Sequence, residues 1–180
     1  NVKSINFNWM ARGEPLANMD FIEGNDYLAC QLEDTVLHFL GLPAKFKIST
    51  IYPNSLTKSL TTFLSNKFEV YYSLYTLNPT VRKMWLPKAA DPRKAVQEMK
   101  IWQDYDAGKQ VVLHFPLIEG VNAFSSVIQD VCNLINDIEL DVRFNLVRFN
   151  SPNKKYIEAD EVDHLLKIFT DNGIQVRKIN

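Results

Sequence analysis

Six short segments with the residue pattern of β-strands recur along the chain, and helical periodicity fills the stretches between them. The strand-like segments are residues 4–9, 45–51, 67–75, 109–118, 141–149 and 174–179. Strands that alternate with helices predict βαβ units and a parallel sheet. The chain has 180 residues and no low-complexity linker, which suits one domain. We therefore expect an α/β fold and a single domain over residues 1–180.

Helical periodicity is clearest in five stretches. They are residues 27–40, 56–64, 93–105, 124–138 and 159–173. Gly41 marks the end of the first stretch, Asn54 or Ser55 could cap the second, and Asp91-Pro92 opens the third. These boundaries predict a helix after nearly every strand.

Several strand-like segments alternate apolar and polar residues, whereas buried parallel strands usually read as continuous apolar runs. In the first segment, Asn6 and Asn8 separate the apolar residues Ile5, Phe7 and Trp9. A period of two gives each strand one apolar and one polar face. If helices cover the apolar face, the polar faces converge on a lumen. We therefore expect about six parallel strands curved into an open, partial TIM-like barrel around a polar ligand; a flat, doubly wound sheet is the alternative.

Composition excludes several classes of protein. No apolar stretch approaches the roughly 20 residues of a membrane helix, and the start has no signal-peptide pattern. Cys30 and Cys132 are the only cysteines, so there is neither a disulfide framework nor a cysteine-rich metal motif. The net charge of −1 argues against a surface that is basic throughout. We expect a cytoplasmic protein with no membrane association.

The segment "MARGEPLAN" (10–18), at the end of the first strand, resembles "MGMGEPLxN" of the RlmN/Cfr family. These radical S-adenosylmethionine (SAM) enzymes methylate adenine in ribosomal and transfer RNA. Five further segments resemble family motifs in the same order: "KISTIYP" (47–53), "YSLYTLNPTVRKMWLP" (72–87), "LHFPLIEGVN" (113–122), "FNLVRFNSP" (144–152) and "NGIQVRK" (172–178). The resemblance runs from residue 2 to the C-terminus and implies part of a radical SAM barrel of the (β/α)6 type.

The resemblance implies a site for S-adenosylmethionine. In the family, the Gly-Glu pair holds the methionine part of this cofactor. Gly13 would let backbone approach the ligand, Glu14 could pair with its ammonium group, and Pro15 would fix the turn. Further positions that match cofactor contacts of the family are Ser49, Ser73 and Asn150, and Tyr75 stands where the family has histidine. Taken singly, each of these polar residues could instead belong to a turn or a cap.

The chain departs from the family in its cysteines. The family's CxxxCxxC motif, which holds a [4Fe–4S] cluster, and its methyl-carrying cysteine have no counterpart here, and neither does its N-terminal RNA-binding extension. Cys30 and Cys132 are expected in the core rather than on a metal. We therefore expect no metal ligands and no catalytic residue in this chain, which would be an inactive part of an RNA adenine methyltransferase. A diverged, non-catalytic barrel, or another radical SAM enzyme with remnants of the cofactor site, is the alternative.

Three expectations concern partners. RNA is implied by the resemblance, and two small basic clusters with aromatic residues, 82–88 and 153–156, could touch it, although a solvated surface is the simpler interpretation. An unpaired edge at residues 4–9 could support a dimer. His114 could face the lumen.

Overall fold

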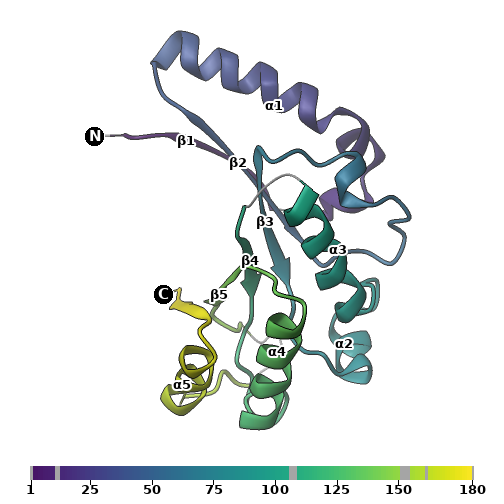
Figure 1. Cartoon of the computed structure of the whole chain (residues 1–180), viewed down its shortest axis with the longest axis vertical. Helices are drawn as coiled ribbons and strands as arrows, with labels where there is room; N and C mark the ends of the chain where they lie inside the picture. Colours follow the sequence, from purple (N-terminus) through teal and green to yellow (C-terminus); the bar gives the residue numbers. More distant parts are fainter. Residues whose placement is uncertain (1, 11–12, 106–108, 151–154, 161, 180) are drawn as a thin grey trace.

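A single sheet of six parallel strands forms the framework of the molecule (Figure 1). The structure is a computed structural model that describes residues 2–10, 13–105, 109–150, 155–160 and 162–179. The strands are β1 (Ile5–Trp9), β2 (Ala44–Thr50), β3 (Phe68–Ser73), β4 (Val111–His114), β5 (Val142–Leu146) and β6 (Gln175–Lys178). Their order across the sheet is their order along the chain. The predicted α/β fold with about six parallel strands is confirmed.

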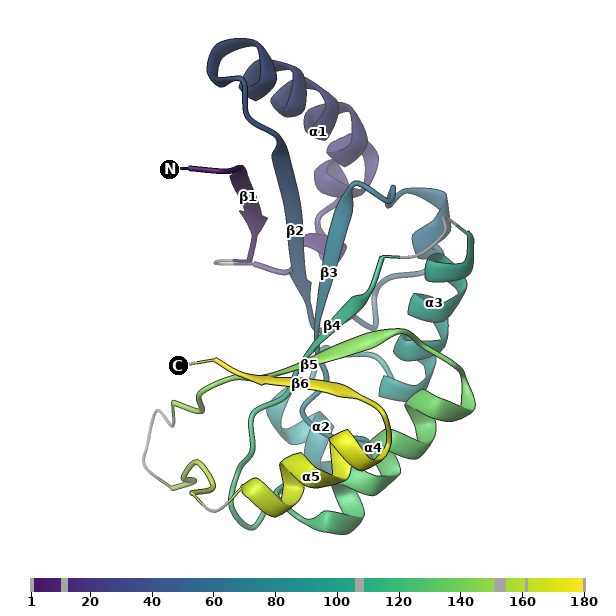
Figure 2. The same ribbon diagram turned by 60° about the vertical axis from the view of Figure 1, so that its left-hand side comes forward.

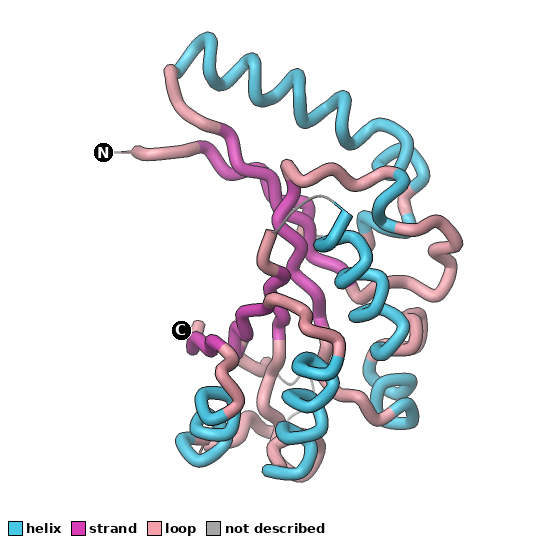
Figure 3. Tube along the Cα trace, viewed as in Figure 1, coloured by secondary structure: helices cyan, strands magenta, loops and turns pink. Residues whose placement is uncertain are grey.

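The helices gather on one side of this sheet (Figures 2 and 3). They are α1 (Met19–Leu40), α2 (Pro79–Trp85), α3 (Pro92–Tyr105), α4 (Ser125–Asp137) and α5 (Asp163–Asp171), with the short 3-10 helices η1 (Pro15–Ala17) and η2 (Leu60–Thr62). The strands twist and curve around the open side, where both termini lie (Figure 2). The arrangement is an open partial barrel rather than a flat sheet with helices on both faces. No helix in the described part of the chain is long and apolar enough to cross a membrane.

Helix α1 is longer than the sequence pattern predicted. It begins at Met19 because the Asn18 side chain accepts hydrogen bonds from the backbone N–H groups of Asp20 and Phe21, at 3.0 and 3.4 Å. It ends where predicted, at Gly41, whose φ of 62° closes the helix in the left-handed conformation. The extra turns bring Phe21 against the sheet.

The helix predicted over residues 56–64 is wrong, since the β2–β3 connection contains only η2. Serine and threonine side chains there make hydrogen bonds both to the local backbone and to α3, which competes with a regular helix. Thr62 Oγ1 donates to the carbonyl of Ser59 at 2.7 Å, and Ser59 Oγ donates to Glu98 Oε2 at 3.0 Å. This connection is the one βα unit of the described chain that lacks an α-helix.

The helix-covered face carries the core. Phe46 of β2 and Phe68 of β3 are opposite each other in register, with ring centroids 5.8 Å apart. Trp9 from β1 and Phe21 from α1 pack on Phe68 at 5.6 and 5.9 Å. Burial of such large rings supplies most of the driving force for packing the helices on the sheet.

The two outer strands have one partner each among the described residues. β1 pairs with β2 and β6 pairs with β5. The open edge expected at β1 is present. A dimer through this edge stays a prediction.

Candidate functional site

Polar side chains form rows across the face of the sheet that the helices leave free. The predicted alternation gives this arrangement, because residues two apart on a strand share a face. One row, near the carboxyl ends of the strands, runs through Ser73, His114, Asn145 and Arg177, which are in register on β3 to β6. The carboxyl ends of parallel strands are where ligands of α/β sheets bind. We call this surface the polar face.

The curvature of the sheet shelters the middle of the polar face. Tyr71 and Val112 are buried although they are separate from the main hydrophobic core. Asn145, from the neighbouring β5, is only 7% exposed. Side chains on this face are therefore partly withdrawn from water, which strengthens their polar interactions.

A connected group of polar and aromatic side chains crosses β2, β3 and β4. Tyr71 donates its hydroxyl to Glu69 Oε2 at 3.2 Å, and Lys47 Nζ lies 3.7 Å from the same oxygen. The His114 ring meets the Tyr71 ring edge-on, with centroids 5.1 Å apart. Burial lowers the pKa of His114 below its ordinary value of 6.5, so the imidazole is neutral at pH 7. A neutral imidazole can both donate and accept a hydrogen bond.

Two buried polar atoms on this face have no hydrogen-bond partner among the residues that the structure describes. They are Nε of Arg143, a donor, and Oδ1 of Asn145, an acceptor. Both residues lie on β5, two positions apart, and face Val112 and His114 of β4 in register. Because buried polar groups are nearly always paired, an unpaired donor and acceptor together indicate a place suited to a polar ligand. Asn145 and Arg143 were not among the residues chosen from the sequence.

Glu14 connects the end of β1 to the end of β2. Its Oε1 accepts from Leu16 N–H at 3.1 Å and from Thr50 Oγ1 at 2.6 Å, and its Oε2 accepts from Ile51 N–H at 2.8 Å. These bonds make the carboxylate a brace between two strand ends. Pairing of Glu14 with a ligand ammonium stays a prediction.

Arg82 holds the carboxyl ends of β2 and β3 together. It is only 3% exposed, although the sequence placed it in a basic cluster of solvated character. Its guanidinium donates to the carbonyls of Ile51 at 3.0 Å and Ser73 at 3.2 Å, to the carbonyl of Leu74, and to the Tyr72 hydroxyl at 2.7 Å. All of these acceptors are neutral, so Arg82 acts as a structural clamp rather than as part of an ion pair.

Asn122, in the segment that resembles the family's "GVN", performs a similar task for β3 and β4. Its side chain accepts from Ile118 N–H at 2.7 Å and donates to the carbonyls of Pro116 and Tyr75 at 2.8 and 2.7 Å. The loops that follow two neighbouring strands are thus fixed relative to each other. Only the fold reveals this role, because Asn122 and Tyr75 are far apart in sequence.

The six residues predicted to contact the cofactor all lie at or beyond strand ends, but in different surroundings. Ser49 and Ser73 are on the polar face. Gly13 and Glu14 line a hollow of about 340 Å³ together with Trp9, on the helix side of β1.

Tyr75 and Asn150 lie outside the strands, so the alternation of side chains along a strand does not apply to them. β3 ends at Ser73 and Tyr75 has a φ of 60°, so a period of two does not fix the direction of its side chain. Burial raises the pKa of its hydroxyl. Asn150 is exposed, four positions after the end of β5, next to residues 151–154, which lie outside the described part of the chain. A cofactor role for all six residues stays a prediction.

An aromatic cluster joins the two basic segments noted in the sequence. It lies in the segments that follow the carboxyl ends of the strands, a region that we call the carboxyl rim. The Trp85 ring is 4.9 Å from the Tyr156 ring and 5.3 Å from the Phe149 ring, measured between centroids. Lys155 Nζ lies 5.3 Å from the centroid of Tyr156. Residues 153 and 154 of the second basic segment are outside the described residues. The cluster places aromatic and cationic groups together beside the polar face.

The two cysteines are separate from this face. Cys132 is buried in α4, and burial raises the pKa of its thiol to about 11; Cys30 is half-buried in α1. Within the described ranges, no three histidine, cysteine or acidic side chains are grouped so that they could hold a metal ion. The donor set that a [4Fe–4S] cluster requires is thus not found among these residues.

Comparison with known proteins gives similarity of structure only. No protein-family model matches the chain, and no curated protein matches it. A domain of pyruvate-formate lyase-activating enzyme from Bacteroides vulgatus ATCC 8482 is similar in fold, with a TM-score of 0.69 and 18% identity over 99% of this chain and 100% of that one.

Two larger enzymes are similar over about half of their length. A radical SAM methyltransferase from Sphaerobacter thermophilus gives a TM-score of 0.70 and 18% identity, covering 97% of this chain and 50% of that one. TYW1 with a lysine–pyruvate adduct bound gives 0.56 and 14%, covering 93% and 49%. The chain therefore has the fold of part of a radical SAM barrel.

Proposed function

We propose that this chain is part of the catalytic barrel of a radical SAM methyltransferase that acts on adenine in ribosomal or transfer RNA. The sheltered polar face, with its unpaired Arg143 Nε and Asn145 Oδ1, is the observation that carries the proposal. Ser73, His114 and Asn145 of this face lie at or near the carboxyl ends of their strands, where a ligand of a parallel barrel is held. Arg143 lies two positions nearer the amino end of β5. The six motifs that resemble the RlmN/Cfr family support the choice of substrate.

S-adenosylmethionine is the ligand that we assign to the polar face. The molecule carries an ammonium group, a carboxylate, a ribose and an adenine, all of which need hydrogen-bond partners. Among the described residues, Asn145 and Arg143 offer an acceptor and a donor without partners, and Ser73 and His114 lie in the same row as Asn145. These residues fit such a ligand. When bound, the cofactor would supply the methyl group.

The [4Fe–4S] cluster of radical SAM enzymes does not fit the described residues, which offer no group of three suitable ligands. We therefore assign no catalytic step to this chain alone and expect it to be colourless and inert as an isolated protein. Anaerobic reconstitution with iron and sulfide, followed by analysis of both, tests this expectation. Uptake of a stoichiometric cluster by the chain would contradict it.

A diverged, non-catalytic barrel is the second candidate. The bonds of Glu14 favour it, because three protein donors already occupy the carboxylate assigned to the ligand ammonium. The two candidates differ in cofactor binding, since a diverged barrel need not retain it.

Calorimetry with S-adenosylmethionine distinguishes the two candidates. We expect weak binding to the chain, reduced several-fold by Asn145→Ala and by Ser73→Ala on the polar face. His38→Ala, at the exposed end of α1, is the matched control and should bind as the parent does. Absence of binding to the parent chain, or equal weakening by all three substitutions, would favour the non-catalytic alternative.

RNA would approach the carboxyl rim, where Trp85 and Tyr156 meet beside Lys155. Aromatic rings and cations together suit unpaired bases and phosphates. Filter binding of a single-stranded adenine-rich RNA should weaken with Lys155→Ala and Lys88→Ala combined. Lys3→Ala combined with Lys45→Ala, which removes the same charge from the opposite end of the sheet, should leave RNA binding unchanged. Equal losses in the two pairs would indicate non-specific attraction.

A further inference from the structure

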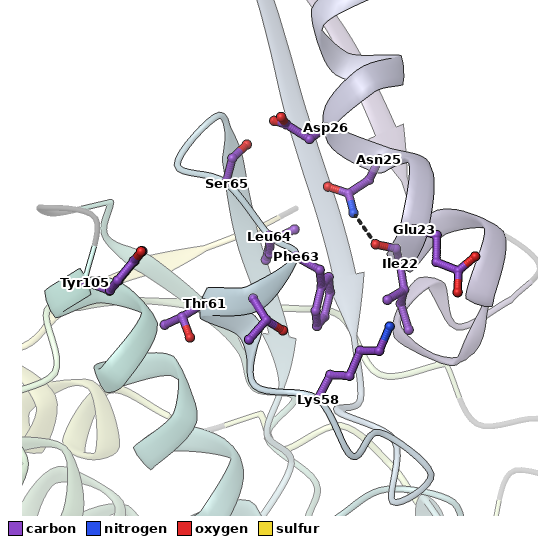
Figure 4. Close-up of a pocket in the computed structure, with 11 residues that line it drawn as sticks. Ile22, Glu23, Asn25, Asp26, Lys58, Thr61, Phe63, Leu64, Ser65 and Tyr105 are labelled. Carbon is purple, nitrogen blue, oxygen red and sulfur yellow. Dashed lines mark hydrogen bonds between the residues drawn. The ribbon is translucent and has the colours of Figure 1, made fainter.

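A groove on the helix side of the molecule lies beside the β2–β3 connection, which has no α-helix (Figure 4). The groove has a volume of about 750 Å³ and runs between α1 and η2, with the end of α3 at its margin. Ile22 and Leu64, which are buried, lie at its base, and Glu23 and Asp26 of α1 line one wall. Its size is that of a site for a sizeable ligand.

The wall formed by α1 is strongly acidic. The helix has five carboxylates in 22 residues and neither lysine nor arginine. Glu33, further along, is paired with Lys67 at 2.5 Å, whereas no ion pair within 4.0 Å is found for Glu23 or Asp26 among the described residues. Lys58 is the one cation among the described residues that line the groove. The groove therefore has an excess of negative charge that is not neutralised locally.

Asn25 adds an unsatisfied acceptor to the acidic wall. The residue is only 1% exposed, and its Nδ2 donates to the carbonyls of Phe21 and Ile22 at 2.9 and 3.2 Å. Its Oδ1 has no hydrogen-bond partner within the described part of the chain. Figure 4 shows the carbonyl end of this side chain directed away from α1 and toward the Leu64–Ser65 side of the groove. A buried acceptor in this position calls for an N–H donor.

The carboxylates, the unpaired acceptor and the apolar base of the groove are complementary to a ligand that carries cations, N–H donors and apolar groups. We propose that the groove binds an extended, basic peptide segment of a protein partner. Lysine or arginine side chains pair with Glu23 and Asp26, a peptide or side-chain N–H reaches Asn25 Oδ1, and apolar side chains cover Phe63 and Leu64. The same carboxylates repel nucleic-acid phosphates. This inference does not depend on the proposed enzymatic function.

Spacing within α1 specifies the peptide further. Glu23 and Asp26 are three positions apart, so they lie on one side of the helix with Cβ atoms about 5–6 Å apart. In an extended chain, residues two apart are separated by about 6.6 Å and point to the same side. Basic residues at alternate positions, with apolar residues between them, therefore match the two carboxylates and the apolar base of the groove.

Fluorescence polarisation with a labelled peptide of alternating lysine and leucine tests the proposal. The combined substitutions Glu23→Gln and Asp26→Asn should weaken binding at least about tenfold, because two cation–carboxylate contacts are lost. Lys58→Gln should have the opposite effect and tighten binding, since it removes the competing cation of the groove. Asp34→Asn combined with Asp137→Asn is the matched control: it removes the same charge from exposed positions outside the groove and should change binding less than twofold.

Three results with the labelled peptide would overturn the proposal. They are absence of binding to the parent chain, equal weakening by the Glu23/Asp26 pair and the control pair, and failure of Lys58→Gln to tighten binding. Spermine, a small polyamine, is tested as a competing ligand in the same assay. If it binds as tightly as the peptide and displaces it, the groove takes a small polyamine and the peptide assignment is wrong.

Discussion

The two faces of the sheet are made by the same strands, yet they differ in polarity and in packing. Phe68 and Val70 of β3 are buried against helices, whereas Glu69 and Ser73, on the same strand, belong to the polar face. One face is apolar and well packed; the other carries the Lys47–Glu69 ion pair, hydroxyls and polar atoms without partners among the described residues. Adjacent residues should therefore respond to substitution in opposite ways: one set affects stability, the other binding.

The largest difference between the faces should appear at Phe68 and Glu69. Phe68→Ala removes a ring in contact with three others and should lower the free energy of unfolding by about 3–5 kcal/mol. Glu69→Ala, one residue away, removes a partly exposed ion pair and should cost less than about 1 kcal/mol. Urea denaturation measures both, and similar losses would show that the polar face also carries the stability of the strand.

Arg82 binds the carboxyl ends of β2 and β3, two strands that contribute to both faces of the sheet. Arg82→Met leaves several buried carbonyls without donors and should cost about 2–4 kcal/mol. Lys83→Met, at the neighbouring exposed position, is the matched control and should be nearly neutral. Thermal unfolding of the two variants gives the comparison. A neutral Arg82→Met would mean that these strand ends are held by packing alone.

Glu14→Gln should have a smaller effect. It preserves the shape of the side chain but removes the charge that strengthens three hydrogen bonds, and we expect a loss of about 1–2 kcal/mol. Glu119→Gln, which neutralises an exposed carboxylate, controls for net charge. If Glu14→Gln is neutral in stability but lowers S-adenosylmethionine affinity, the carboxylate serves the ligand and not the fold.

The smallest effect concerns His114 and pH. Because burial lowers its pKa in the folded state, the unfolded chain binds a proton more readily. The contribution of His114 to the free energy of unfolding is absent well above pH 6.5. It becomes destabilising as the pH falls below that value, because the unfolded chain then takes up the proton. His114→Gln should remove this part of the pH dependence in urea titrations at several pH values, while His164→Gln, at an exposed position, should preserve it. An unchanged profile in His114→Gln would contradict the assignment.

The faces of the sheet could be predicted from the sequence because alternation is a local property. Asn6, Asn8 and Glu69 fall opposite the helices as their spacing requires. Gly41 likewise ends α1 through its own conformational freedom. Fold class and the polar face follow from such local signals.

The details of the site depend on contacts between distant residues and could not be predicted in the same way. Glu14 meets Thr50, and Asn122 meets Tyr75, only after the strands have paired. Burial of Asn145 Oδ1 without a partner among the described residues also depends on the neighbouring strands, and β5 alone does not predict it. Tyr75 escaped the alternation because the strand ends two residues before it.

The agreement between strand order and chain order has a consequence for how the molecule folds. Each strand pairs with the strand next to it in sequence, so no strand must wait for a partner made much later. Loop closure then involves only one βα unit at a time, which keeps its entropic cost low. A chain emerging from the ribosome can therefore add these units to a growing sheet in the order of their synthesis, with the newest strand at the edge.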